Sequence, residues 1–274
     1  ANVTCTELSN AGTGTYVLNN GVTLTANVTH KSTTSSNCLT FSAASPATAS
    51  IVGNITAGSP NPSSAVANTG TGALSVTGAI VGGSFSTASG LSQGTLGSVT
   101  ITGNATGSLG PAVLNTGGGT INLTGNVTGG TAAGIYGISN SSIGSVNVTG
   151  NITGGTISTS AHGLNNASTG ICTIVGTCTG GLAGSAGANN AAAGTITATR
   201  AKGNGFGIGS VATAAAVGAA SAQSSITKIE EVEFGALGMS PVSGPCYITP
   251  RTTNVAIFTK YPGGTGTKTL VDAT

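Results

Sequence analysis

The sequence predicts an all-β protein folded as a single-stranded parallel β-helix, and three observations carry this prediction. Near-identical phrases recur, such as "SVTITGNATGS" at 98–108, "TINLTGNVTGG" at 120–130 and "SVNVTGNITGG" at 145–155. Within each phrase, apolar residues alternate with Thr or Asn. A second phrase that ends in Asn or Gln recurs in the other half of each copy. Repeats that cannot bury an apolar face alone are typical of a solenoid.

The repeat has a period of about 25 residues over about eight copies. The small residue that precedes the Asn of "TGN" marks each copy, beginning at Ala26 and ending at the equivalent Arg200. The markers between them are Gly53, Gly78, Gly103, Gly125, Gly150 and Gly176. We expect about eight coils, wound right-handed by the strand twist that governs parallel crossovers. The alternative is a sandwich of hairpins, which would show Asn-Gly-type turns at shorter spacing.

Each copy reads as a strand, a corner and a second strand. Before the marker Gly150, Val146 and Val148 alternate with Asn147 and Thr149, which predicts one buried and one exposed face. The marker glycine predicts a sharp corner, because glycine adopts positive φ at little cost. An Asn follows the corner in most copies, and we expect these residues to form a ladder: Asn54, Asn104, Asn126 and Asn151.

A second ladder is predicted in the other half of each copy. Its members each follow an apolar residue by two positions, and they are Asn68, Gln93, Asn115, Asn140, Asn166 and Asn190. If coils stack at the strand spacing of about 4.8 Å, these amides lie above one another and hydrogen-bond along the stack. One copy is about three residues shorter, and the missing residues lie before Asn115.

The two ends depart from the repeat. We expect residues 1–20 to form a cap or partial coil, 21–205 the β-helix repeats, and 206–274 a distinct β-rich cap or attachment module. Three of the five acidic residues lie close together in the stretch "ITKIEEVEF" of that last segment. It also carries a candidate partner contact, an apolar patch with a charged rim: Ile229, Val232 and Phe234, with Lys228, Glu230, Glu231 and Glu233. The alternative is a solvated end without a partner.

Composition excludes several classes of protein. Only 4% of residues are charged, against roughly 25% in an average domain, and the net charge is +2. These few cations cannot form the basic stripe that nucleic acids require. No apolar run reaches the roughly 20 residues of a membrane span, so we expect a soluble protein or assembly. The chain begins at Ala1 without Met, which indicates a processed product or part of something longer.

Catalysis is not expected, because the repeats lack acids. No Asp or Glu lies between Glu7 and Glu230. Glycoside hydrolysis needs two carboxylates, and calcium sites need several. The two histidines, His30 and His162, have no acid inside the coils to orient them in a triad. We expect no cofactor and no metal site.

The cysteines leave two alternatives open. Cys172 and Cys178 occupy inward positions on either side of the corner of one coil, as a disulfide or as two small buried side chains. Cys5 and Cys38 could form a disulfide at the amino-terminal end, which would suit an extracellular particle.

The phrases "INLTGNVTGG" and "VNVTGNITGG", with "YGISNSS" and "HGLNNAS" between them, resemble the repetitive β-helical proteins of tailed bacteriophages. The tail "YPGGTGTKTLVDAT" is similar to segments near the end of such repeats. The resemblance covers roughly residues 70–205 and the last fifteen. It implies a virion component such as a fibre, spike or head decoration, and it carries no catalytic residue.

Three functional classes follow. The first is a non-enzymatic virion protein that binds its own copies, as a trimer, or capsid or tail proteins, and so mediates attachment to a host surface. The second is a cell-surface adhesin or filament subunit of a bacterium or archaeon. The third is a binding solenoid of the ice-binding type, because outward pairs such as Thr100 and Thr102 recur from coil to coil.

Overall fold

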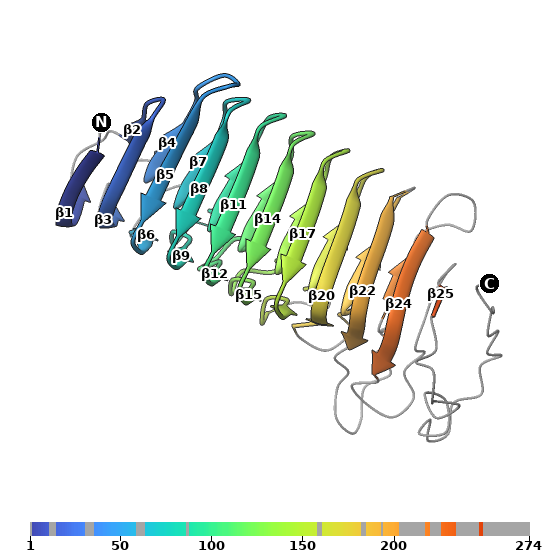
Figure 1. The fold of residues 1–274 in the computed structure, drawn as a ribbon. Coiled ribbons are helices and arrows are strands. Elements are labelled where there is room, and N and C mark those ends of the chain that lie inside the picture. Colours follow the sequence, from blue (N-terminus) through green and yellow to red (C-terminus); the bar gives the residue numbers. More distant parts are fainter. Residues whose placement is uncertain are drawn as a thin grey trace, which may run out of the picture.

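A computed structural model describes most of the chain, including strands from every predicted coil. The described residues are 2–10, 15–30, 36–58, 64–85, 88–157, 161–181, 185–192, 194–202, 217–219, 226–233 and 247–248. Every element among them is a strand, and the strands lie side by side in one elongated stack (Figure 1). The predicted parallel β-helix is therefore confirmed.

The strands form two parallel sheets, which we call sheet A and sheet B. Sheet A has sixteen strands: β1 (Asn2–Asn10), β3 (Val22–His30), β5 (Thr48–Val52), β6 (Ile55–Ala57), β8 (Ala73–Thr77), β9 (Ile80–Val81), β11 (Ser98–Thr102), β12 (Ala105–Thr106), β14 (Thr120–Thr124), β15 (Val127–Thr128), β17 (Ser145–Thr149), β18 (Ile152–Thr153), β20 (Ile171–Thr179), β22 (Thr195–Lys202), β24 (Ile226–Glu233) and β25 (Tyr247–Ile248). Sheet B has nine strands: β2 (Tyr16–Leu18), β4 (Leu39–Phe41), β7 (Val66–Asn68), β10 (Leu91–Gln93), β13 (Val113–Asn115), β16 (Ile138–Asn140), β19 (Leu164–Asn166), β21 (Ala188–Asn190) and β23 (Val217–Ala219).

Successive coils stack in strict register. Val99 pairs with Ile121, and Ile121 pairs with Val146 in the next coil. The short copy keeps this register, because Leu91 still pairs with Val113 in sheet B. Its deletion is therefore absorbed in the connection before β13.

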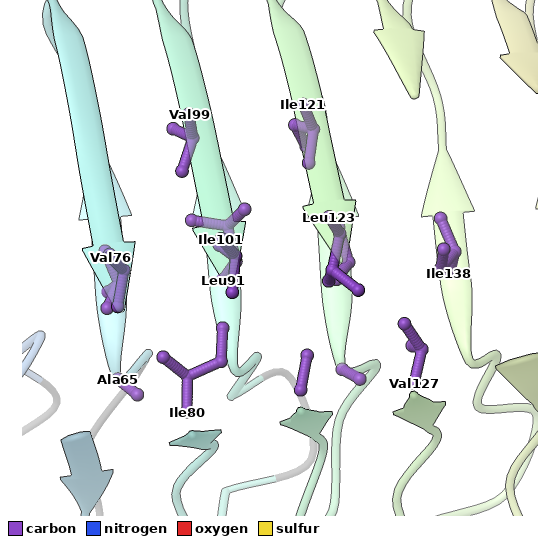
Figure 2. Close-up of a cluster of buried hydrophobic side chains, with 14 of the residues drawn as sticks. Ala65, Val76, Ile80, Leu91, Val99, Ile101, Ile121, Leu123, Val127 and Ile138 are labelled. Carbon is purple, nitrogen blue, oxygen red and sulfur yellow. The ribbon is translucent and has the colours of Figure 1, made fainter. Parts of the chain in front are cut away.

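The inward residues of both sheets form one continuous core. Val99, Ile121 and Val146 are fully buried, and so are Leu91 and Ile138 from sheet B. Figure 2 shows Val99 beside Ile121, and Ile101 beside Leu123, in neighbouring coils. Because each coil buries its apolar face against its neighbours, the stack is the unit of stability.

The corner after the long strand depends on glycine in six coils, whereas β3 runs through it at Ala26. Gly53, Gly78, Gly103, Gly125, Gly150 and Gly176 have φ between 144° and 153°, a region that residues with a side chain rarely adopt. The expected last marker is wrong, however. Arg200 pairs with Thr177 and not with Gly176, because the register shifts within the corner of β22. The coil that contains β22 therefore turns this corner without a glycine, and β22 runs through the corner unbroken.

The parallel pairing of strands continues beyond both ends of the predicted repeats. β1 pairs with β3 and β2 pairs with β4, so the residues before 20 supply strands to both sheets. At the other end, β24 pairs with β22, and β25 pairs with β24. The strand stack thus extends past residue 205, where the sequence pattern ends.

Candidate functional site

The outward side of the long strands of sheet A is the most regular surface of the molecule, and we call it the front face. Three columns of side chains run along it in the register of the sheet. The first column is Thr48, Ala73, Ser98, Thr120, Ser145, Ile171 and Thr195. The second is Thr23, Ser50, Ser75, Thr100, Asn122, Asn147, Thr173 and Thr197. The third is Thr25, Val52, Thr77, Thr102, Thr124, Thr149 and Val175.

The front face carries no charge. No Asp, Glu, Lys or Arg lies between Lys31 and Arg200 in the chain. Some of its polar groups bond along the columns: the Ser50 hydroxyl donates to Thr23 Oγ1 at 2.9 Å, and Asn147 Nδ2 donates to Asn122 Oδ1 at 2.9 Å. Such a face binds through shape and neutral hydrogen bonds and not through ion pairs.

The front face is hollowed at one end and raised at the other. Small residues of strands β3, β5, β8 and β11 line an open hollow of about 400 Å³, with Ala73, Ser50 and Ser75 in it. Three coils further along, Ile171 and Val175 stand 51% and 59% exposed on β20. Val52 and Val175 also interrupt the third column, so the hydroxyl array is not continuous.

An aliphatic pair borders the front face beside the first column. Leu96 and Ile143 are each 70% exposed, and they come from coils on either side of Gly118. A Cβ on Gly118 would lie 2.7 Å from Leu96 Cδ2 and 3.3 Å from Ile143 Cγ1, so both side chains lean over the glycine. Sequence reasoning missed this pair, because neither residue belongs to a repeated apolar position.

The second amide ladder lies inside the molecule. Asn115 Nδ2 donates to Asn140 Oδ1 at 2.9 Å, Asn140 Nδ2 to Asn166 Oδ1 at 2.9 Å, and Asn166 Nδ2 to Asn190 Oδ1 at 3.1 Å. All of the ladder amides are fully buried, including those of Asn68 and Gln93. The three bonds give a buried Nδ2 group an acceptor in each case, whereas Asn115 Oδ1 is buried without a partner among the described residues, so this run of amide pairs begins at Asn115. Its role is structural, because it pairs polar groups within the core.

A glycine packs directly on each amide of this ladder. A Cβ on Gly144 would lie 2.7 Å from Asn115 Nδ2, and one on Gly170 would lie 2.3 Å from Asn140 Nδ2. Asn140 Nδ2 also donates to the Gly144 carbonyl, and Asn166 Nδ2 to that of Gly170 at 2.9 Å. The sequence held a signal for this contact, since a glycine follows each of these amides by four residues.

The corner ladder uses its amides differently. Asn104 Oδ1 accepts the backbone N–H of Asn126 at 2.9 Å, and Asn126 Oδ1 accepts that of Asn151 at 3.0 Å. Asn54 and Asn151 accept in the same way from Ala79 and Thr177. These side chains are exposed, and they link one coil to the next through the backbone and not through amide pairs.

His162 has a comparable link at another position of the coil. Its Nδ1 accepts the backbone N–H of Ala186 at 3.0 Å, and its ring stacks on Tyr136 with centroids 5.7 Å apart. Asn37 makes the equivalent bond in an earlier coil, where its Oδ1 accepts the N–H of Ser64 at 3.1 Å. Burial lowers the pKa of His162 from 6.5 to about 4. The imidazole is thus a neutral hydrogen-bond acceptor in the fold.

We expect acid to destabilise the protein through His162. The folded pKa is lowered to about 4, so between pH 6.5 and 4 the unfolded chain binds a proton that the folded chain does not. Stability that is complete above pH 6.5 is therefore lost as the pH falls, by about 1–3 kcal/mol. Urea unfolding at a series of pH values measures this loss. His162→Asn keeps an acceptor and should flatten the dependence; an unchanged slope would contradict the assignment.

The structure forms neither of the disulfides that the sequence left open. Cys38, Cys172 and Cys178 are free and buried. Cys172 and Cys178 pair with Val146 and Ile152 of the preceding coil, so they fill core positions. Burial raises the pKa of both Cys38 and Cys172 to about 12, and burial with the nearby Cys172 raises that of Cys178 further. The side chain of Cys5 lies outside the described residues.

The pairing of β24 with β22 gives the backbone positions of most residues in the predicted contact patch. Ile229 pairs with Ala198 and Val232 with Ala201, and both alanines are buried. In the same backbone pairing, Glu231 is in register with Arg200 and Glu233 with Lys202. Lys228 is in register with Thr197, Glu230 lies between the paired residues Ile229 and Glu231, and Phe234 lies outside the described residues. The backbone of β24 thus continues sheet A, and the contact patch stays a prediction, because its side chains lie outside the described residues.

Within the described part of the chain, no three His, Cys, Asp or Glu side chains gather as metal ligands. In the same residues there is no helix with the length and apolar character to cross a bilayer. No family model, curated protein or solved structure matches the chain. The surface features that bear on function are the front face, its hollow and its aliphatic border.

Proposed function

We propose that the chain is a non-enzymatic structural protein of a virion, as a fibre, spike or capsid-decoration subunit. The front face is the observation that supports this proposal: a rigid, uncharged surface repeated over successive coils. Such a surface suits lateral packing in an assembly, because it gives neither charge repulsion nor a single small-molecule site. The phage-like phrases of the coils point in the same direction. The acid-free coils lack the paired carboxylates of a glycan-cleaving spike.

The experiment is detection of the protein in purified virus particles. Particles from the source of the gene are banded by density, and each fraction is probed with an antibody against the folded protein. We expect the signal to follow the particle band and to survive a second sedimentation. A signal confined to washed cells would favour the adhesin alternative and overturn the proposal.

The ice-binding alternative is not proposed. Asn122 and Asn147 replace hydroxyls in the second column, and they hydrogen-bond to each other. Val52 and Val175 interrupt the third column, and Ile171 interrupts the first. The array is thus less regular than a lattice of ordered water would require.

A further inference from the structure

We infer that the front face binds the front face of a second copy of this chain, with the two stacks antiparallel. The inference goes beyond the proposed function, because it names an interface and a partner that a virion, a cell surface or a free protein could each use. It depends on the arrangement of the hollow, Ile171, Leu96, Ile143 and Gly118 about a single strand, β14.

The first step is the symmetry of the features about β14. In the order of sheet A, β11 and β17 flank β14, β8 and β20 come next, and β5 and β22 lie outside them. A twofold axis that lies between two facing copies and runs along β14 would therefore place β8 of one copy against β20 of the other. The strands keep their direction under this operation, so each column meets the same column of the partner.

The second step is shape. Under this axis, Ile171 of the raised end meets Ala73 of the hollow, because both belong to the first column. Val175 meets Thr77 in the third column by the same relation. A hollow of about 400 Å³ is large enough to accept an isoleucine side chain and its neighbours. The interface is self-complementary, since each copy offers one raised end and one hollow.

The third step is the aliphatic border. Leu96 precedes β11 and Ile143 precedes β17 by the same number of residues, while Gly118 holds that position before β14. The axis therefore brings Leu96 of each copy to Ile143 of the other, with Gly118 facing its own counterpart. Because Leu96 and Ile143 of each copy lean over Gly118, the four apolar side chains of the two copies would meet at the axis. This contact would cover the two apolar side chains that share the highest exposure among the large hydrophobics of the described chain.

The fourth step is area and charge. Five residues along each strand and the seven strands β5 to β22 give a patch of about 550 Å² per copy at the usual strand spacings. The pair would bury about 1,100 Å², which meets the roughly 1,000 Å² expected of a specific interface. No like charges oppose one another, because the columns contain only neutral residues.

An alternative twofold axis along the stack would make a different dimer. In that dimer the two stacks would run parallel and the facing strands antiparallel. The hollow of one copy would then face the hollow of the other and leave a void. Under that axis, Thr124 would face Thr120 of the partner. Under the axis that we infer, Thr124 faces Thr124, whereas Thr77 faces Val175. Thr124 and Thr77 are both exposed members of the third column, so they form a matched pair for cross-linking.

The experiment uses the full chain. Analytical ultracentrifugation at micromolar concentrations should show a dimer, and the double variant Leu96→Ser with Ile143→Ser should weaken it at least tenfold in Kd. Both positions are exposed, so circular dichroism should stay unchanged, and so should thermal unfolding at concentrations where the wild-type chain is monomeric. With a short bismaleimide, Thr124→Cys should form a covalent dimer above the wild-type background, and Thr77→Cys should not.

Four results would overturn the inference. These are a monomer at all concentrations, a trimer, equal cross-linking at both positions, or thermal hysteresis from a monomer that adsorbs to ice. A dimer in solution from a protein that is absent from virus particles would refute the proposed function and leave this interface intact. The reverse result would refute the interface alone.

Discussion

Replacing Gly150 by alanine is expected to prevent stable folding or to reduce the free energy of unfolding by at least about 3 kcal/mol. Gly150 has a φ of 148°, which a residue with a Cβ rarely adopts. A Cβ at this position would also lie 2.0 Å from the carbonyl oxygen of Gly125 and 2.6 Å from its carbon. Neither atom can move, because both belong to the backbone of the preceding coil.

Gly134→Ala is the matched control for this prediction. Gly134 also has a positive φ, 71°, but nothing lies within 4 Å of its Cβ position. Gly134→Ala should therefore reduce the free energy of unfolding by only about 1–2 kcal/mol, which is the strain of the left-handed region. Urea unfolding of the two variants separates backbone strain from the collision between coils. Equal losses would show that stacking distance does not dictate the corner glycine.

Replacing Asn140 by alanine is expected to reduce the free energy of unfolding by about 3 kcal/mol or more. Asn140 accepts from Asn115 Nδ2, and its own Nδ2 donates to Asn166 Oδ1 and to the Gly144 carbonyl. The substitution would leave these three groups buried without their partner. A lost partner inside a core costs more than a lost partner at the surface, because water cannot replace it.

Asn147→Ala tests that reason with a second amide pair of the same length. Asn147 Nδ2 donates to Asn122 Oδ1 at 2.9 Å, but this pair lies on the exposed front face. Water replaces the lost bond there, so we expect a change below about 1 kcal/mol. The two variants are compared by urea unfolding at neutral pH. Similar losses for both would contradict a structural role of the buried ladder.

The sequence was sufficient for the repeated part of the fold. Val99, Ile121 and Val146 hold equivalent places in successive phrases, and the structure stacks them in one column. The alternation around them specifies which side is buried. The amide ladder could be predicted for the same reason, since a residue that recurs at the period of the coil must meet its own equivalent. In a parallel stack, residues that recur at the period of the coil therefore contact one another.

The sequence failed where the pattern stops. Arg200 reads as the eighth corner residue by its spacing, yet the backbone shifts there and pairs it with Thr177. Ile229 and Glu231 lie beyond the repeat, and the pattern did not show that their backbone continues sheet A. Strand pairing forms wherever backbone groups are aligned, whether or not the side chains repeat. Spacing between side chains therefore could not locate these last strands.

The sequence alone determined the coil, its period, its buried columns and its lack of charge, because each of these is a property of residues close together in the chain. Only the tertiary structure decided which unlike residues meet between coils. It placed Leu96 and Ile143 over Gly118, set Gly144 against the amide of Asn115, and opened a hollow beside Ala73. These contacts depend on how far apart the backbones of neighbouring coils lie, and a distance between backbones follows from packing and not from a pattern of letters.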